Sequence, residues 1–335
     1  MSTAQRQPRQ LRIGVVMDPL PQVHPDKDTT FALMLEAQKR GHELWVIHHR
    51  DLYCRDDDVR TIARRAEVFR PTAAGGEHHH FHESAPLSLA DLDAVWMRTD
   101  PPVDADYLYA THLLSLVEAR GVFVMNRPAA IRDANEKLYA LNFPDCIPKT
   151  LLTRDVGRLK EFLGEVGGEM ILKPPHGWGG LGIFHVHAGD RNLNAILETV
   201  TENGRVLTMA QEYIKAVREL GDERVIMLDG EPLGAIARVP REDEHRSNLH
   251  VGGTARKVVL GPRERRICDQ VGPKLRAAGL YFVGLDIIGD YLTEVNVTSP
   301  TGIQEIDRLD GVCLETKVIE LVEGKAAVAK ATRKN

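Results

Sequence analysis

The segment YFVGLDIIGDYLTEVNV, residues 281–297, decides the fold, because two apolar strands flank a Gly-Asp turn and so predict a β-hairpin. Three polar side chains interrupt its apolar pattern: Asp286, Glu294 and Asn296. Glu294 and Asn296 are two residues apart in one strand, so their oxygens point to the same face. Carboxylate and amide oxygens are ligands that suit Mg²⁺. The alternative is a structural ion pair, since buried acids without a cation are destabilising.

A glycine-rich loop, GWGGLG, lies between two short predicted strands at 169–173 and 183–186. It matches G-x-G-x-x-G, but a dinucleotide fingerprint must open a helix, and here a strand follows. The run also lacks the Gly-Lys-Ser/Thr of a Walker A loop. Glycines such as Gly179 and Gly180 let backbone N–H groups approach phosphates, although a plain glycine-rich hairpin is the alternative. Lys173 favours the phosphate interpretation, because a lysine among apolar strand neighbours needs an anionic partner.

The first third of the chain alternates strands with helices, which predicts a mostly parallel sheet covered by helices. Two helices are expected, one starting at Asp28 or Thr29 and ending at Gly41, the other running from Asp104 to Gly121. The later part contains antiparallel hairpins mixed with helices, which indicates an α+β region. Buried strands are expected at 11–17, 44–48, 94–97 and 122–125, and a further hairpin at 224–228 and 233–239 around Asp229-Gly230.

Composition excludes several classes of protein. The 335 residues carry a formal net charge of −5 with both signs mixed along the chain, which disfavours nucleic acid as a partner. No segment is apolar enough to span a bilayer, and the polar start lacks a secretory signal, so we expect a cytoplasmic protein with no membrane partner. The four cysteines form no C-x-x-C and are expected to be reduced. Residues 55–89, which include HHHFH at 78–82, read as an irregular solvated loop rather than a metal site.

Taken together, these features resemble the ATP-grasp superfamily and, more narrowly, bacterial glutathione synthetases. The matching motifs cover nearly the whole chain in the family's order: VMDP (16–19), MRTDPP (97–102), DANEKL (133–138), ILKPPHGWGG (171–180), AQEYI (210–214), ARVP (237–240) and FVGLDIIGDYLTEVNVTSPTG (282–302).

The resemblance implies an α/β and α+β fold: an N-terminal, mostly parallel α/β (pre-ATP-grasp) domain followed by a two-lobed ATP-grasp fold. The expected bounds are a disordered tail at 1–10, an N-terminal substrate domain at 11–128, a first lobe with the glycine loop at 129–210, and a second lobe with the metal hairpin and a lid loop at 211–325.

It also implies a reaction: glutathione forms from γ-glutamylcysteine and glycine through an acyl phosphate, with ATP as co-substrate and Mg²⁺ or Mn²⁺ as cofactor. A homo-oligomer, a tetramer in the family, is expected. An acyl phosphate must be kept from water, and the polar stretch 241–257 is expected to form a lid over it, with a simple exposed loop as the alternative.

Site residues carry over position by position. Lys137 and Lys173 correspond to phosphate-contacting lysines, and Arg224 and Arg238 to arginines that face the transferred phosphoryl group. The other expected residues are the metal ligands Asp286, Glu294 and Asn296; the adenine-binding strand edge Gln211, Glu212, Tyr213 and Ile214, with Glu212 accepting from the exocyclic amine; the loop glycines Gly179 and Gly180; and the substrate contacts Arg98, Ser299, Gly252 and Gly253.

The metal site that the resemblance implies fixes the register of the hairpin. A regular two-residue turn at Gly289-Asp290 would place Asp286 opposite Thr293, and therefore on the far face from Glu294. For the acids to share a face, the connection must be one residue longer or contain a bulge that brings Asp286 opposite Glu294. Gly289 or Asp290 would then supply the positive φ.

Three other functions stay open from the sequence alone. Another ATP-grasp ligase could join different carboxylates and amines with the same fold and ATP chemistry, although MRTDPP favours glutathione synthetase. A nucleotide-binding regulatory protein, as in synapsins, would have no need of Lys137, Lys173, Asp286, Glu294 and Asn296 together. A nicotinamide dehydrogenase is suggested only by the glycine motif.

Overall fold

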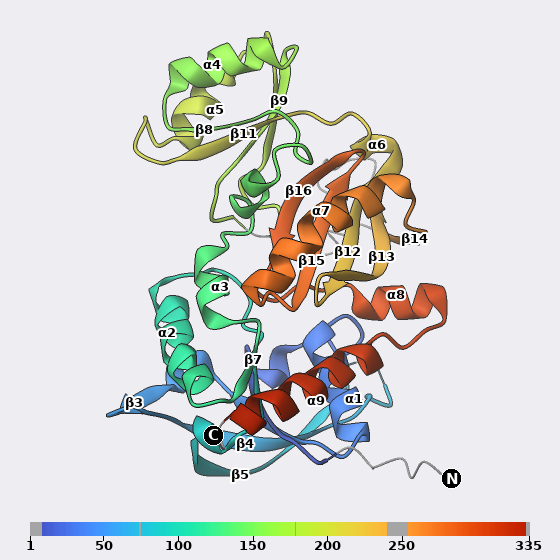
Figure 1. Cartoon of the computed structure of the whole chain (residues 1–335). Helices are drawn as coiled ribbons and strands as arrows, with labels where there is room; N and C mark the ends of the chain where they lie inside the picture. The colour runs from blue at the N-terminus through green and yellow to red at the C-terminus, as the bar shows by residue number, and fades with distance from the viewer. Residues whose placement is uncertain (1–8, 74, 178, 240–253, 333–335) are drawn as a thin grey trace.

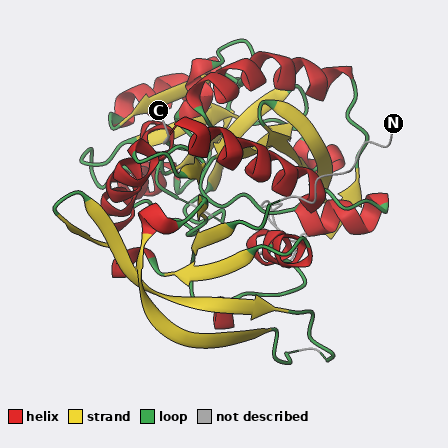
Figure 2. Cartoon of the chain, turned by 60° about the horizontal axis from the view of Figure 1, so that its bottom comes forward, coloured by secondary structure: helices red, strands yellow, loops and turns green. Residues whose placement is uncertain are grey.

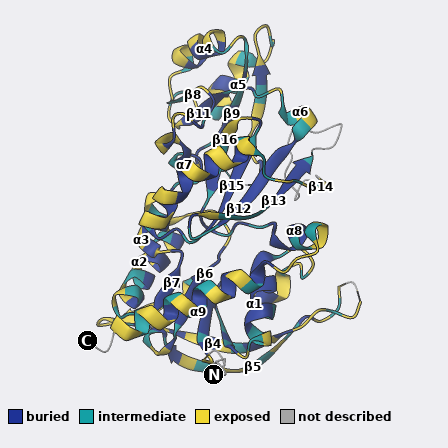
Figure 3. Ribbon diagram, turned by 45° about the vertical axis from the view of Figure 1, so that its right-hand side comes forward, coloured by how far each residue is buried: buried dark blue, intermediate teal, exposed yellow. Residues whose placement is uncertain are grey.

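The computed structural model describes residues 9–73, 75–177, 179–239 and 254–332. Figure 1 shows three sheets stacked along the molecule, with the N-terminal sheet at the bottom, the five-stranded sheet in the middle and the four-stranded sheet at the top. The central strands β12 and β15 of the middle sheet are buried, whereas the helix α7 beside it exposes its outer face (Figure 3). Within the described residues, no helix is long and apolar enough to cross a membrane.

The N-terminal sheet has seven strands in the order β3-β4-β2-β1-β6-β7, with β5 paired to β4. The core strands β2, β1, β6 and β7 are parallel, as the alternation predicts, and β4 is antiparallel to its neighbours. The bounds are β1 (Arg12–Val16), β2 (Glu43–Ile47), β3 (Tyr53–Arg55), β4 (Asp58–Val68), β5 (His79–Ser88), β6 (Ala94–Met97) and β7 (Phe123–Met125), with α1 (Thr29–Lys39), α2 (Ala105–Ala119), α3 (Pro128–Asp133) and the 3₁₀ turns η1 (Leu20–Gln22), η2 (His49–Asp51) and η3 (Leu89–Asp91).

Both predicted helix starts are confirmed by side-chain caps. Asp28 Oδ1 accepts a hydrogen bond from the Phe31 N–H at 2.6 Å, and Asp104 accepts from the Tyr107 N–H at 2.9 Å. Gly41 follows α1 at φ +86°, a conformation that favours glycine and ends the helix.

The prediction of an irregular loop at 55–89 is wrong. This segment forms the long antiparallel hairpin of β4 and β5, whose curved strands lie at the bottom of Figure 2. Its buried residues alternate with outward-facing ones: Val59, Thr61 and Ala63 are buried, whereas Arg60, Ile62 and Arg64 between and after them are exposed. That period of two is the strand signal, and the arginines on the outer face hid it. His78 is buried, with Nε2 at 2.9 Å from the Leu20 carbonyl, so it is part of the core.

The four-stranded sheet has the order β10-β9-β11-β8 and the five-stranded sheet the order β14-β13-β12-β15-β16. The bounds are η4 (Tyr139–Asn142), β8 (Thr150–Thr153), α4 (Val156–Glu165), β9 (Glu169–Lys173), β10 (Phe184–His187), α5 (Leu193–Val200), β11 (Thr208–Glu212), α6 (Val217–Leu220), β12 (Asp222–Leu228), β13 (Glu231–Val239), β14 (Thr254–Lys257), α7 (Pro262–Ala278), β15 (Phe282–Ile288), β16 (Tyr291–Asn296), α8 (Ile303–Asp310) and α9 (Glu315–Thr332).

The last helix returns to the first domain. α9, which begins inside the segment expected to belong to the second lobe, packs against α1, and Arg40 forms an ion pair with Glu323 at 2.8 Å. One continuous apolar core joins the face of the N-terminal sheet that α1 and α9 cover to β12 and β13 of the five-stranded sheet. The four-stranded sheet instead has a core of its own, built with α4 and α5.

Candidate functional site

A cavity of about 210 Å³ lies between the four-stranded and five-stranded sheets. Elements distant in sequence contribute to it: the segment after α3, the end of β9 with its glycine loop, the end of β11, and β12, β15 and β16. Most of the predicted site residues line it: Lys137, Lys173, Gly179, Gly180, Gln211, Glu212, Tyr213, Ile214, Asp286 and Glu294.

The hairpin has the register that a shared acidic face requires. Asp286 lies opposite Glu294, although Ile288 still pairs with Tyr291 across a two-residue turn with Gly289 at φ +59°. A bulge supplies the extra residue, because Thr293 has no partner of its own in the ladder. Its hydroxyl donates to the Asp286 carbonyl at 3.1 Å, and this bond closes the bulge. The predicted bulge is therefore confirmed.

Strand pairing places three more charged residues on the cleft face of the five-stranded sheet, beside Asp286 and Glu294. Arg224 on β12 lies directly opposite Asp286 on β15, and Asp222 on β12 lies opposite Arg238 on β13. Directly opposed residues of antiparallel strands share a face, so the two arginines and the acids form one layer. Local sequence reasoning could not foresee this, because strand pairing between β12 and β15 is a tertiary event.

Arg224 and Arg238 are neutralised by ion pairs with acidic side chains. Arg224 holds the Asp286 carboxylate with two bonds, Nε–Oδ1 at 2.5 Å and Nη2–Oδ2 at 3.1 Å, and Arg238 Nη2 approaches Asp286 Oδ2 at 2.9 Å. Burial opposes the charge, yet these two guanidinium groups hold the pKa of Asp286 below its usual value. The ion pair that the sequence left open is present, and it holds the side chain of Asp286, the predicted metal ligand.

Lys137 and Lys173 have fewer acidic partners than the two arginines. Lys137 Nζ lies 2.9 Å from Glu294 Oε1 and also donates to the Gly177 carbonyl. Lys173 is buried and donates to the Thr293 carbonyl at 3.3 Å. Burial lowers the pKa of Lys173 to about 8, against the attraction of Glu294. A buried lysine with a lowered pKa gains most from an arriving anion, which fits a phosphate group.

The glycine loop joins two antiparallel strands, as predicted, since β9 pairs with β10. Gly179 and Gly180 have φ of +61° and +82°, so the loop needs glycine to turn its backbone toward the cleft. At the other end of the cavity, the Tyr213 ring stacks on His185, with ring centroids 3.9 Å apart. The aromatic pair and the half-buried Glu212 give this end the form of a base-binding site.

Three oxygen-bearing side chains fit a divalent cation by their chemistry. Asp286 and Glu294 are opposed carboxylates, and Asn296 is two ladder positions further from the turn, opposite Gly284. The Asn296 Nδ2 donates to the Gly284 carbonyl at 3.2 Å, which leaves its Oδ1 as the ligand atom. Carboxylate and amide oxygens suit Mg²⁺ and Mn²⁺ alike.

Two predicted substrate contacts lie outside this cavity's lining, at the boundary with the N-terminal domain. Arg98 is buried at the end of β6, and its guanidinium donates to Thr30 Oγ1 and to the Pro300 carbonyl, each at 3.0 Å. Ser299 precedes Pro300, so the two predicted residues are brought together. Gly252 and Gly253 fall outside the described residues.

Sequence reasoning missed two acids of the site. Asp222 lines the cavity, and burial together with the nearby Asp286 raises its pKa to about 6 against the pull of Arg238. Glu136 accepts from the Val297 N–H at 3.1 Å and from the Thr298 hydroxyl at 2.8 Å, and so holds the end of β16. Burial, and then Glu294, raise the Glu136 pKa. Glu136 lies inside the quoted DANEKL motif, where only its lysine was singled out.

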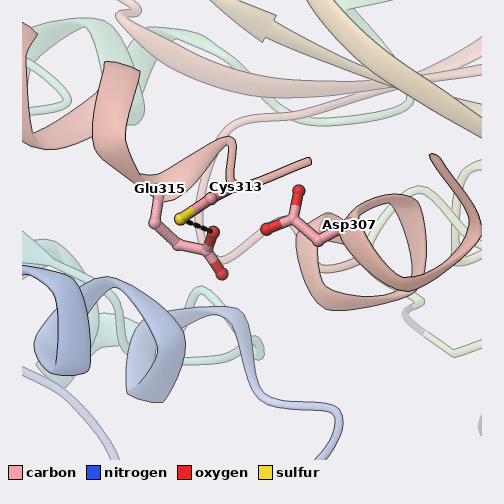
Figure 4. Close-up of side chains that lie close together, drawn as sticks. All are labelled: Asp307, Cys313 and Glu315. Atoms are coloured by element: carbon pink, nitrogen blue, oxygen red, sulfur yellow. Dashed lines mark hydrogen bonds between the residues drawn. The ribbon is translucent and has the colours of Figure 1, made fainter. Parts of the chain in front are cut away.

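A second acidic cluster lies at the junction of α8 and α9, away from the cavity (Figure 4). Asp307, Cys313 and Glu315 bring their ligand-type atoms within 4.8 Å of one another. Cys313 Sγ is 3.5 Å from Glu315 Oε2, and both Asp307 oxygens accept from the Leu314 N–H. No sequence motif marks this cluster, because its members come together only where α8 ends and α9 begins.

Comparisons with known proteins agree with this architecture. The family model "prokaryotic glutathione synthetase, N-terminal domain" matches residues 11–132, and its ATP-grasp domain matches residues 136–311. Glutathione synthetase from Brucella melitensis biotype 1 is 44% identical over 315 residues, 94% of this chain and 99% of the relative. Glutathione synthetase from Pseudomonas syringae pv. tomato is 43% identical over 321 residues, 96% of this chain and 99% of the relative.

Solved structures of lower identity show the same fold. D-cycloserine synthetase DcsG superposes with a TM-score of 0.64 at 15% identity, covering 94% of this chain and 99% of that one. The ATP-grasp ligase PsnB in complex with a minimal precursor superposes with a TM-score of 0.61 at 17% identity, covering 94% and 99%. The predicted ATP-grasp fold is therefore confirmed.

Proposed function

Because the chain belongs to the prokaryotic glutathione synthetase family, we propose that the cavity between its two lobes is where γ-glutamylcysteine, glycine and ATP react. The chain is an ATP-dependent ligase that forms glutathione. In the proposed reaction, the cysteine carboxylate of the dipeptide attacks the γ-phosphorus of ATP, and the bond to the β,γ-bridging oxygen breaks. The glycine amine then attacks the acyl carbon, the amide bond forms, and phosphate leaves.

ATP would lie along the cavity with its base at one end and its phosphates at the other. Tyr213 and His185 offer an aromatic surface for adenine, and the half-buried Glu212 offers an acceptor for its amine. The backbone N–H groups near Gly179 and Gly180, together with Lys137 and Lys173, would meet the phosphates.

Arg224 and Arg238 would stabilise the phosphoryl group as it transfers. Their guanidinium groups lie in one layer with the acids, and Arg238 Nε has no hydrogen-bond partner among the described residues. A donor already buried and oriented needs no reorganisation when charge develops on the phosphoryl oxygens. We assign Arg98 and Ser299 to the peptide end of the site, where the N-terminal domain meets the loop after β16.

Asp286, Glu294 and Asn296 would hold the cation, Mg²⁺ or Mn²⁺. When bound, the cation neutralises charge on the β- and γ-phosphates. Lys137 lies against Glu294 and the two arginines against Asp286, so the cations and the residues that would hold the metal share one end of the cavity. One observation supports the proposal most: the bulge at Thr293 brings Asp286 opposite Glu294, beside both lysines.

The test is an ADP-release assay coupled to glutathione detection. With Mg²⁺, ATP and γ-glutamylcysteine, we expect steady turnover only when glycine is added, with one ADP and one phosphate per glutathione. Hydroxylamine in place of glycine should trap the acyl phosphate as a hydroxamate. Turnover that does not need the dipeptide, or that needs a different acid and amine, would contradict the assignment.

We also propose a cytoplasmic homo-oligomer, a tetramer by resemblance to the family. Four free cysteines, two of them buried, fit a reducing compartment. Light scattering coupled to gel filtration would give the subunit count, and a monomer at micromolar concentration would contradict a tetramer.

A further inference from the structure

Asn126 lies directly after β7, where the N-terminal sheet meets the hairpin of β15 and β16. Its side chain is buried, and its amide makes three hydrogen bonds with backbone groups of residues 156 and 171 positions further along the chain. Oδ1 accepts from the Phe282 N–H at 2.7 Å, and Nδ2 donates to the carbonyls of Phe282 at 2.8 Å and Val297 at 2.9 Å. One side chain therefore joins both strands of the hairpin to the first domain.

Asn126 bonds to Phe282 because the backbone pairing between β15 and β16 stops before Phe282. The last pair of this ladder, counted away from the turn, is Gly284 with Asn296, so the next backbone partner for Phe282 would be Thr298. Thr298 instead donates both its N–H and its hydroxyl to Glu136, at 3.3 and 2.8 Å. The Asn126 side-chain amide provides Phe282 with the donor and the acceptor that the backbone of the next strand residue would have provided.

A second residue of the same domain contacts the same segment. Arg98 bonds to the Pro300 carbonyl, and its guanidinium lies over the Phe282 ring at 5.4 Å from the centroid. Because the hairpin carries Asp286, Glu294 and Asn296, a shift at its base moves these side chains together. Fixed placement of reacting groups is worth a large factor in rate, and a misplacement of about 1 Å can lower it about a hundredfold.

We propose that Asn126 is a positioning residue for the ligation: its amide completes the base of the metal-binding hairpin and so fixes the phosphoryl end of the cleft against the N-terminal domain. This inference rests on the proposed function. It predicts that loss of the amide disturbs turnover more than nucleotide binding, since the base-binding end belongs to the other sheet.

Asn126→Ala tests this, with Gln38→Ala as a matched control. Gln38 is also a side-chain amide bonded to one backbone residue, since it donates to the Val68 carbonyl and accepts from the Val68 N–H, each at 2.8 Å, far from the hairpin. We expect Asn126→Ala to lower kcat by about tenfold to a hundredfold and to raise the Mg²⁺ concentration for half-maximal rate, with KM for ATP within about threefold. Gln38→Ala should lower Tm without this loss of kcat.

Asn126→Ser keeps one donor and acceptor and provides a milder variant should the alanine protein fail to fold. All rates are measured well below the Tm of every variant. If wild type turns over and the Asn126 variants match its kcat and Mg²⁺ dependence while losing Tm, Asn126 is merely structural and the inference is overturned. If wild type forms no glutathione, the proposed function fails, and the inference falls with it.

Discussion

Two clusters of charged side chains, one buried in the cleft and one half-buried at the α8–α9 junction, are built on opposite principles. In the cleft, four cations (Lys137, Lys173, Arg224 and Arg238) are buried among carboxylates on one face of a sheet and its neighbour. At the α8–α9 junction, Asp307 and Glu315 approach each other with a thiol beside them, and burial, followed by the nearby Glu315, raises the Asp307 pKa. In the function that we propose, the first arrangement offers its cations to an anionic ligand, whereas a proton relieves the repulsion in the second.

The difference teaches which buried charges serve function. A structural cluster can be replaced by neutral groups of similar shape with little loss, because desolvation offsets the attraction within it. A functional cluster loses activity under the same replacement even when the fold gains stability. Activity and stability, measured on the same variants, therefore distinguish a functional cluster from a structural one.

The largest effect is expected from Lys173→Met. Removing one preorganised cation from a phosphoryl-transfer site lowers kcat by about a hundredfold or more. Stability should not fall at pH 7: burial lowers the Lys173 pKa to about 8 from 10.5, so keeping this lysine protonated is unfavourable there. Steady-state kinetics and thermal unfolding check the pair of outcomes. A variant that loses activity in proportion to a lowered Tm would make Lys173 a structural lysine.

Arg224→Met should lower activity and stability together. The variant leaves the buried Asp286 with only Arg238, and breaking a buried pair lowers the free energy of unfolding by about 3–5 kcal/mol. The double variant Arg224→Met/Asp286→Leu removes the uncompensated charge, so it should regain most of the stability and none of the activity. Denaturant titration measures the stability of the single and the double variant, and the ADP-release assay measures their activity. Recovery of activity in the double variant would exclude the pair from catalysis.

Nucleotide binding should depend on pH through Lys173. Its pKa of about 8 means that the lysine loses its proton as the pH rises from 7 to 10, so ADP affinity should decrease over that range. The free energy of unfolding should change in the opposite direction and increase with pH. Burial favours the neutral form of Lys173, so its contribution to stability is complete above pH 10.5 and is lost as the pH falls through about 8. Calorimetric titration of ADP against wild type and Lys173→Met shows whether the slope disappears with the lysine. An equal slope in both would assign it to another group.

Much of the cleft could be predicted from the sequence because its signals are local. The period of two placed Glu294 and Asn296 on one face, and side-chain parity together with the family resemblance required the bulge that Thr293 supplies. The missing parts depend on the exact pairing of strands and on contacts between domains. Asp222 precedes the strand predicted at 224–228 and becomes a site residue through its pairing with Arg238, whereas Asn126 depends on a contact with the hairpin of another domain. Asp307 and Glu315 are close in sequence, but no sequence pattern predicts that the turn between α8 and α9 brings them together.

The smallest effect is expected from Asp307→Asn, and it concerns stability alone. Asp307 has its pKa raised to about 8 from 3.8, first by burial and then by Glu315, so the folded chain holds a proton that the unfolded chain has lost. The stability that this proton provides is complete below pH 3.8 and is lost as the pH rises through about 8, where two carboxylates face each other. Other charges face the junction, since Thr316 beside it bonds to Glu36, and Asp310 pairs with Lys257 at 2.9 Å. An asparagine cannot ionise and can donate to Glu315, so the Tm of the variant minus that of wild type should increase from pH 6 to pH 9, by about 2–4 °C for each kcal/mol gained.

Asp145→Asn, a change at an exposed acid, serves as the control, with no such trend expected. Because the junction lies outside the cleft, kcat should stay at the wild-type value at both pH values. A flat difference in Tm would mean that the pair is already separated in solution, and a loss of kcat would tie the junction to the reaction.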